Sequence, residues 1–233
     1  MHPADISNRS NGFSLVELAI VLVIVALLAS GLMMGMTAQR TSAENTDAQR
    51  QLENIREALL GYAMANGRLP CPAPANVANT AANAGVALTP PCDNALQYGV
   101  VPWVTLGLPE SDPWGRRFTY FASSNFTAAL SGGAQASFTL ATLGNGNVKD
   151  TATSSANIAS DLPAVVVSHG SKGAGAWQPD GTQVAGAAND ELENANGTLT
   201  FVSRTPGETF DDLVTWIVPS ILKSKMVAAG RLP

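Results

Sequence analysis

Ser168 and His169 are neighbours in the sequence, and a hydroxyl beside an imidazole is the pairing that nucleophilic hydrolysis uses. The two residues close an apolar run that begins at Ala164, which we expect to be a β-strand, and neighbouring residues on a strand point to opposite faces. No nucleophile elbow surrounds the serine, and no third residue is identifiable that would orient the imidazole. The sequence also has no phosphate-binding loop and no dinucleotide-binding fingerprint. We therefore predict that the protein is not an enzyme.

The two cysteines of the chain, Cys71 and Cys92, flank a segment rich in proline, alanine and asparagine. No histidine or third cysteine lies near them to complete a metal site. A disulfide is the simplest interpretation. It would close a loop of about twenty residues and stabilise the protein by roughly 3 kcal/mol in an oxidising compartment. Two reduced structural thiols are the alternative.

Glu17 indicates a different kind of chemistry, because this carboxylate directly precedes a long apolar run. The run from Leu18 to Met36 has no charged residue, and as a helix it would extend about 28 Å, nearly the thickness of a bilayer core. We predict that it is a membrane segment. A carboxylate at the centre of such a helix costs about 2.5–3.5 kcal/mol on insertion scales, so Glu17 needs either a partner or a place among lipid headgroups.

A cleaved secretory signal is the alternative interpretation of this segment, with Ala29 and Gly31 offering a weak cleavage site. Three features argue against it. The run is longer than the usual core of a signal peptide, the polar leader has only Arg9 as a firm positive charge, and the run begins with the acidic Glu17.

Residues 12–17, with the sequence Gly-Phe-Ser-Leu-Val-Glu, resemble the processing site of type IV prepilins and type II secretion pseudopilins. In that family a short polar leader ends in glycine, phenylalanine follows, and glutamate is the fifth mature residue. The resemblance implies that an inner-membrane prepilin peptidase cuts between Gly12 and Phe13 and that the new amino terminus at Phe13 is N-methylated. Gly12 suits such a cut, because a residue without Cβ allows the closest approach to the backbone.

The same resemblance implies a role for Glu17 in assembly, because in the family this carboxylate pairs with the charged amino terminus of a neighbouring subunit. Such pairing favours association, since an unmatched carboxylate in a low dielectric costs several kcal/mol. An unpaired carboxylate among headgroups is the alternative. Positive charge does not decide the orientation of the span, because Arg9 precedes it while Arg40 and Arg50 follow. The resemblance implies a single-pass protein of the bacterial inner membrane, with a cytoplasmic leader and a periplasmic head.

After Met36 the pattern becomes amphipathic, which predicts that the helix continues. Apolar residues recur at helical spacing at Ala48, Leu52, Ile55, Leu59 and Tyr62. We expect the helix to end near Asn66 and Gly67, after about 54 residues and about 80 Å. The predicted organisation is a cleaved leader at residues 1–12, a transmembrane and filament-core helix at 13–36, its amphipathic continuation at 37–67 and a periplasmic globular head at 68–233.

The head is expected to contain a small, mainly antiparallel β-sheet packed on the long helix, which makes the fold α+β and pilin-like. The proline-rich segment between the cysteines is predicted to be a stapled loop. Strands are predicted at residues 118–121, 137–143, 164–168 and 198–203. The last element, at residues 210–229, is predicted to be a helix with Thr209 as its N-cap, which Pro219 should kink or divide.

A second resemblance lies in the head, at Asp112-Pro113-Trp114-Gly115, which is similar to a signature that major pseudopilins of type II secretion carry after their long helix. In physical terms the motif is a turn with an aromatic anchor. Asp112 is expected to accept backbone hydrogen bonds, Pro113 to fix φ, and Trp114 to pack on the sheet. A generic turn would have the same composition.

Pseudopilins of this kind bind calcium through a C-terminal loop, and calcium prefers oxygen ligands. The acidic candidates in this chain are Asp190, Glu191, Glu193, Asp211 and Asp212. The match is not residue by residue, because the glycine-rich calcium loop of the family is replaced here by residues 168–173 and a longer insertion. A solvated acidic loop, with Asp212 capping a helix, is the favoured alternative. We therefore expect no cofactor, with calcium as the one candidate.

The predicted function is structural. The net charge of −5 opposes binding to nucleic acid unless the basic residues cluster on one face. We expect the protein to polymerise through its N-terminal helix into a type IV pilus-like or type II secretion pseudopilus filament. The expected partners are other pilin or pseudopilin subunits, the prepilin peptidase, the inner-membrane assembly platform and the lipid bilayer. Two alternatives stay open: a minor pilin or tip adhesin, and a membrane-anchored periplasmic binding module that does not polymerise.

Overall fold

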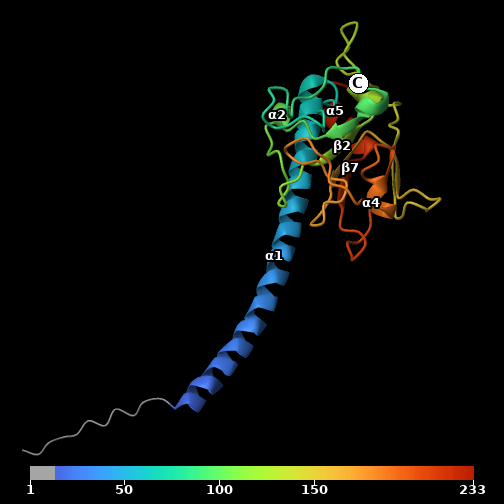
Figure 1. Cartoon of the computed structure of the whole chain (residues 1–233). Helices are drawn as coiled ribbons and strands as arrows, with labels where there is room; N and C mark the ends of the chain where they lie inside the picture. Colours follow the sequence, from blue (N-terminus) through green and yellow to red (C-terminus); the bar gives the residue numbers. More distant parts are fainter. Residues whose placement is uncertain (1–13) are drawn as a thin grey trace, which may run out of the picture. The chain divides into compact units, whose positions relative to one another are not determined.

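The computed structural model of the protein describes residues 14–233, and for residues 29–38 it describes the backbone alone. Gly12 and Phe13, the predicted cleavage site, lie outside the described residues. The chain divides into two compact units, residues 1–43 and residues 44–233. Helix α1, Leu15–Asn66, begins in the first unit and ends in the second (Figure 1).

The first unit consists, within the described residues, of the N-terminal part of α1. Its large apolar side chains between Leu15 and Leu28 are 50–85% exposed. Among the residues whose side chains the structure describes, no helix has a stretch that is long and apolar enough to cross a membrane. The span predicted from Leu18 to Met36 continues into residues 29–38, whose side chains lie outside that description.

The part of α1 in the second unit carries a stripe of buried side chains that starts the core of the head. The members of this stripe are Ala48, Leu52, Ile55, Leu59, Leu60 and Ala63, each at most 3% exposed. Apart from Leu60, which widens the stripe beside Leu59, their spacing of three and four residues places them on one face of the helix, as predicted. Tyr62, which was also expected on this face, is only half-buried.

Helix α1 ends at Asn66, where the sequence predicts its end. Gly67 adopts a φ of +71°, a conformation that favours glycine, and its N–H donates to the Ala63 carbonyl at 2.8 Å. The Arg231 guanidinium, from the C-terminal end of the chain, donates to the carbonyls of Met64 (2.9 Å) and Ala65. A cation at this position stabilises the helix end, because it meets the negative end of the helix dipole.

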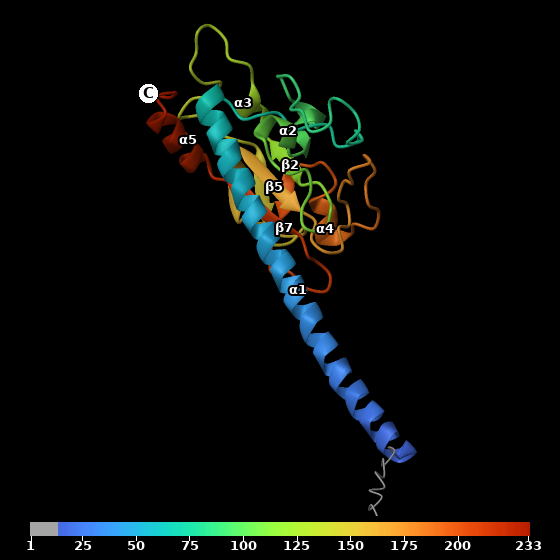
Figure 2. The ribbon, with the colours of Figure 1, turned by 90° about the vertical axis from the view of Figure 1, so that its left-hand side faces the viewer.

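A four-stranded antiparallel sheet forms the centre of the head, with the strand order β1-β2-β5-β7. The strands are β1, Tyr98–Val100; β2, Thr119–Ala122; β5, Ala164–Ser168; and β7, Leu213–Ile217. Figure 2 shows the upper part of α1 running along this sheet. Side chains alternate between the two faces, so Ala164 and Val166 join the core that α1 covers, while Val165 and Val167 pack into a second cluster.

The second cluster lies between the central sheet and a three-stranded sheet with the order β4-β3-β6. These strands are β3, Gly146–Lys149; β4, Ala159–Leu162; and β6, Thr200–Val202. Strand β3 pairs with β4 antiparallel and with β6 parallel. The fold is therefore α+β and mainly antiparallel, as predicted, but it has two sheets rather than one. Both faces of β2 and β5 are buried as a result.

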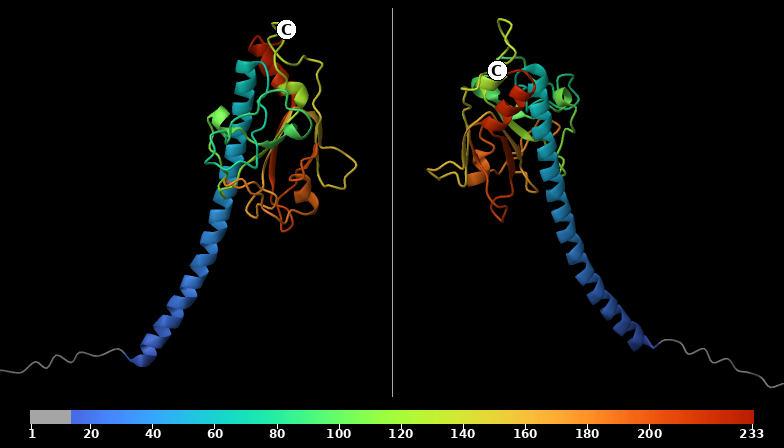
Figure 3. Two further views of the ribbon diagram at one scale, coloured as in Figure 1. Left: turned by 45° about the horizontal axis from the view of Figure 1, so that its top comes forward. Right: turned by 180° about the vertical axis from the view of Figure 1, so that it is seen from behind.

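Short helices precede, connect or follow these strands. They are a 3-10 helix, η1, Asn94–Gln97, and the α-helices α2, Trp103–Leu106; α3, Ser124–Thr127; α4, Asn189–Glu193; and α5, Pro219–Ala228. Figure 3 shows α5 beside the C-terminal end of α1, where Leu222 and Met226 enter the main core.

Two predicted elements are wrong. Residues 137–143 form turns rather than a strand, because the Thr139 and Thr142 side chains satisfy local backbone groups; Thr139 N–H donates to the Thr142 hydroxyl at 3.0 Å. Residues 210–229 are not one helix, since β7 occupies residues 213–217. Its β-branched and aromatic residues pair with β5 along its whole length, and this long-range pairing overrides the local pattern.

The end of the chain agrees with the prediction only in part. Pro219 divides the predicted element, as one of the two expectations had it: it lies in the first turn of α5, shortly after β7, where its missing N–H costs nothing. Thr209 is not an N-cap, and its hydroxyl accepts a hydrogen bond from Arg204 at 3.2 Å.

Candidate functional site

Glu17 closes the first turn of α1. Its carboxylate accepts a hydrogen bond of 2.9 Å from the Ser14 backbone N–H, and the Ser14 hydroxyl accepts one of 3.3 Å from the Val16 N–H. This arrangement resembles a capping box, except that the serine bonds to the second rather than the third residue of the helix. It satisfies two of the N–H groups that a helix start leaves without partners. Glu17 is exposed in the single chain, so its carboxylate remains accessible to a further partner.

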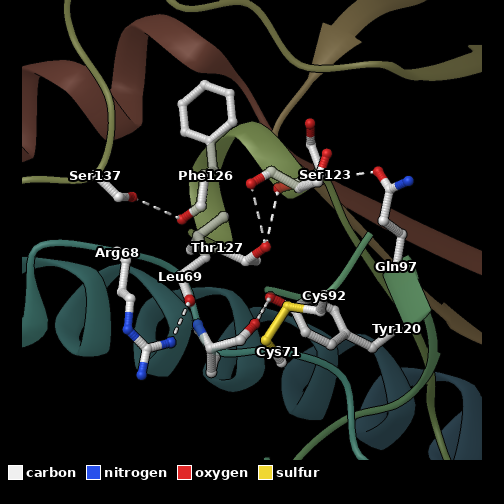
Figure 4. The surroundings of a disulfide bond; sticks show 12 residues. Arg68, Leu69, Cys71, Cys92, Gln97, Tyr120, Ser123, Phe126, Thr127 and Ser137 are labelled. Carbon is white, nitrogen blue, oxygen red and sulfur yellow. Dashed lines mark hydrogen bonds between the residues drawn. A yellow bond between two sulfur atoms is a disulfide. The ribbon is translucent and has the colours of Figure 1, made fainter. Parts of the chain in front are cut away.

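The disulfide between Cys71 and Cys92 is present, with the Cα atoms 5.9 Å apart and both residues fully buried (Figure 4). The chain on its N-terminal side is tied to the central sheet and to α3. The Tyr120 hydroxyl, from β2, donates to the Pro70 carbonyl at 3.1 Å, and the Leu69 N–H donates to the Phe126 carbonyl at 2.8 Å. The loop is thus stapled, as predicted, at the point where α1 gives way to the head.

The Asp112-Pro113-Trp114-Gly115 motif forms a turn organised by one buried carboxylate. Asp112 Oδ1 accepts hydrogen bonds from the Trp114 N–H (3.0 Å) and the Arg116 N–H (2.9 Å). Its other oxygen accepts from the Ser168 hydroxyl at 2.8 Å, which attaches the turn to the end of β5. Burial raises the pKa of the Asp112 carboxyl, and the hydrogen bonds from Arg116, Ser168 and Trp114 oppose that rise.

Trp114 points from this turn to α1. Its ring packs against the main core, and its indole N–H donates to the Glu44 carboxylate at 3.1 Å. The anchor therefore bonds to the helix and packs on the core that α1 shares with the central sheet. One turn thus connects the helix, through Trp114, with β5, through Asp112.

Arg117, two residues after the motif, is fully buried although it is charged. Its guanidinium pairs with Glu110 at 2.8 Å and lies over the Trp103 ring at 4.7 Å. It also donates to three carbonyl groups, those of Ala75 (3.0 Å), Val77 (2.7 Å) and Pro179 (3.0 Å). One guanidinium thus holds the stapled loop and the loop around Pro179 together.

Ser168 and His169 do not form a catalytic pair. The serine hydroxyl donates to Asp112, while His169 Nε2 is 2.9 Å from the Thr119 hydroxyl. His169 Nδ1 lies 3.7 Å from Asp212 Oδ2. Both residues are fully buried, so a substrate has no direct access to either of them.

Three of the acidic calcium candidates come together, and two lie elsewhere. Carboxylate oxygens of Glu191, Asp211 and Asp212, which we call the acidic cluster, lie within 4.8 Å of one another. Asp190 instead pairs with Arg204 at 2.8 Å. Glu193 accepts a hydrogen bond of 2.7 Å from the Asn196 amide. Within the acidic cluster, burial and the negative charge of Asp212 raise the pKa of Glu191, while Lys172 opposes the rise.

Two family models match consecutive segments of the chain. The model described as "Prokaryotic N-terminal methylation motif" matches residues 7–33, and the model described as "Type II secretion system (T2SS), protein G" matches residues 35–161. The second match covers more than half of the 233 residues. The chain belongs to the type II secretion system protein G family. Comparison with curated proteins and with solved structures gives no match.

The protein G family consists of structural pseudopilins, which are membrane-anchored and are not enzymes. The Asp112 turn, Arg117 and the disulfide all lie inside the region that the protein G model matches, and the acidic cluster lies beyond it. The resemblance that the sequence showed at residues 12–17 is confirmed at the level of the family by the methylation-motif match.

The acidic cluster of this protein G family member is a poor fit for calcium. Calcium takes six to eight oxygen ligands, and a loop supplies part of them through its carbonyls. Here the carbonyls of Gly170 and Ser171 accept hydrogen bonds from the Arg116 guanidinium, at 2.8 and 3.0 Å. The Lys172 ammonium also lies 3.7 Å from Glu191 Oε1. The Arg116 guanidinium and the Lys172 ammonium therefore already interact with the oxygen atoms that a metal ion would need as ligands.

Sequence reasoning did not find Glu44, Arg116, Arg117 or Lys172. Arg116 and Arg117 directly follow the pseudopilin motif, which is the one signal that could have drawn attention to them. Nothing in the local pattern shows which arginine is buried, because their partners lie up to 62 residues away in the sequence.

Proposed function

We propose that the mature chain begins at Phe13, carries an N-methyl group there, and polymerises through its N-terminal helix as a subunit of a type II secretion pseudopilus. One observation carries this proposal. The methylation-motif match at residues 7–33 and the protein G match at residues 35–161 meet on a single helix, α1, whose apolar side chains near the N-terminus are exposed.

The exposed apolar side chains are compatible with both proposed environments of the subunit, the membrane before assembly and the filament after it. Side chains from Leu15 to Leu28 that are 50–85% exposed would be strongly unfavourable in water. Lipid covers them before assembly, and the helices of neighbouring subunits cover them in the filament. The subunit can therefore move from membrane to filament without placing this surface in water.

Glu17 makes the proposed move of the subunit from the membrane into the filament specific, because its carboxylate selects a cationic partner. Within the described residues its carboxylate accepts the Ser14 N–H, at 2.9 Å, and a carboxylate has capacity for further donors. The amino terminus that the peptidase creates on a neighbouring subunit is a cation of the right kind. In the low dielectric of a filament core, this pair satisfies two charges that would each be costly alone.

The test compares Glu17→Ala with Glu53→Ala in the full-length protein in its native host. Glu53 is a suitable control because it also lies on α1 and its ion pair with Arg56 is exposed. We expect Glu17→Ala to abolish recovery of the protein in sheared or cross-linked filaments while its amount in the membrane stays unchanged, and Glu53→Ala to assemble normally. Normal assembly of Glu17→Ala contradicts the proposal and favours an anchored binding module.

Mass spectrometry of the amino terminus tests the processing step separately. We expect a methylated Phe13 at the start of the mature chain. A mature chain that starts beyond Ala29 would overturn the proposal, because the helix that polymerises would have been removed.

A minor pilin is the second candidate, favoured by the large part of the head that lies beyond residue 161 and so outside the protein G match. This part contains β5, β6, β7, α4 and α5. Co-purification with the secretion assembly platform supports the pseudopilus, whereas recovery in sheared surface pili supports the minor pilin.

A further inference from the structure

The acidic cluster places three carboxylates side by side, two of them buried and that of Asp211 half-buried. Glu191 comes from α4, and Asp211 and Asp212 directly precede β7. In each carboxylate one oxygen is buried and, among the described residues, has no hydrogen-bond partner: Glu191 Oε1, Asp211 Oδ1 and Asp212 Oδ1. Like charges this close destabilise one another unless a cation or donors compensate them.

The other oxygens of the two aspartates are satisfied by groups of the chain. Asp211 Oδ2 accepts from the Ser171 hydroxyl at 2.9 Å and from the Lys172 backbone N–H at 2.7 Å. Asp212 Oδ2 accepts from the Asn194 amide at 2.8 Å. The charge of the acidic cluster is therefore partly spread over donors, and Glu191 is the member that still needs a cation.

Lys172 is placed to be that cation. Its ammonium lies 3.7 Å from Glu191 Oε1, the very oxygen that has no hydrogen bond, and donates to the Glu208 carbonyl. Its own backbone N–H is bonded to Asp211. The lysine is thus held at both ends, so its charge stays beside the acidic cluster.

Arg116 holds the loop that presents Lys172. Its guanidinium donates to the carbonyls of Gly170 and Ser171, at 2.8 and 3.0 Å. The guanidinium also lies against Gly173, where φ is +64° and a Cβ would overlap it. The loop is therefore built around a protein cation and turns its carbonyls toward that cation.

We infer that the Lys172 ammonium is the resident cation of the acidic cluster, so that the C-terminal part of the head stays folded without a divalent metal ion. The inference concerns the head alone and does not depend on whether the chain polymerises. It also differs from what the family resemblance implies, which is a calcium-dependent loop.

The test uses the full chain in detergent micelles and measures thermal unfolding by near-ultraviolet circular dichroism, in chelator and in millimolar calcium. We expect the wild type to have the same Tm in both conditions. Lys172→Met leaves Glu191 without a cation, so we expect its Tm in chelator to fall by roughly 5 °C and to be largely restored by calcium. Lys172→Arg keeps a cation and is expected to remain insensitive to calcium.

Three outcomes would overturn the inference. In the first, calcium raises the Tm of the wild type and titration calorimetry detects its binding, which makes the metal the resident cation. In the second, Lys172→Met unfolds like the wild type in both conditions. If Lys172→Met does not accumulate, the double variant Lys172→Met/Glu191→Gln removes the unpaired charge and is expected to fold in chelator. Failure of that double variant is the third.

Discussion

The indole N–H of Trp114 donates a 3.1 Å hydrogen bond to the carboxylate of Glu44, 70 positions earlier in the chain. Glu44 is also the first residue of the compact unit that forms the head. The bond therefore joins the Asp-Pro-Trp-Gly turn to α1 at the point where the head begins. It fixes where the turn sits on the helix, because an indole N–H can donate in one direction only.

Trp114→Phe should lower the free energy of unfolding of the head by about 1 kcal/mol, because phenylalanine keeps most of the ring packing but has no N–H to donate. Denaturant unfolding of the full chain in detergent would measure the change. Glu44→Gln is the matched variant, since its amide oxygen can still accept the bond, and it should change stability less than Glu44→Ala. The double variant Trp114→Phe/Glu44→Ala should be less destabilised than the sum of the single changes. Strict additivity would show that the bond contributes nothing.

Arg117→Met should be far more damaging than loss of an exposed arginine. It leaves Glu110 without its buried partner and three carbonyls without a donor, at a cost of about 3 kcal/mol or more. We expect the stapled loop to become sensitive to limited proteolysis. Arg50→Met is the control, because the pair that Arg50 forms with Asp47, at 3.6 Å, is exposed. Its loss should change stability by less than about 0.5 kcal/mol. Equal effects of the two substitutions would contradict the role assigned to Arg117.

Asp112 should make the head less stable as the pH rises. Burial raises its pKa in the folded protein above the ordinary value of 3.8, so the folded state favours the protonated form. The stability that this group contributes is fully present below 3.8 and is lost as the pH increases through the raised pKa. Relative to Asp112→Asn, which does not titrate, the wild type should therefore become less stable between acidic and neutral pH.

Asp180 is a control for the measurement of stability against pH, because its pKa is shifted in the opposite direction to that of Asp112. Its pKa is lowered by hydrogen bonds from the Thr182 hydroxyl and N–H, at 2.7 and 2.9 Å. Its contribution is therefore present above 3.8 and is lost as the pH falls through its folded pKa. Unfolding curves of Asp112→Asn and Asp180→Asn over the same pH range should diverge from the wild type in opposite directions. A parallel response of the two variants would contradict the assignment for Asp112.

Much of the fold could be predicted because the signals are local. The stripe from Ala48 to Ala63 follows from helical spacing, the end of α1 from Gly67, and strand β5 from a run of valines. The failures at residues 137–143 and 210–229 both concern runs whose local pattern does not decide their structure. Whether a short run of apolar and β-branched residues becomes strand, helix or turn depends on the partner it finds, and β7 finds β5 while residues 137–143 find no strand.

By itself the sequence determined the features whose chemistry is complete within a short segment: the Gly-Phe-Ser-Leu-Val-Glu motif, the apolar run after it, and the turn around Asp112. Tertiary structure alone decided which charges are buried together. Arg117 donates hydrogen bonds to carbonyls of two distant loops, and Lys172 pairs with Glu191, 19 positions away. No local sequence pattern predicts either pairing. The physical reason is that a charge acquires its partner and its low-dielectric surroundings only when the chain has folded around it.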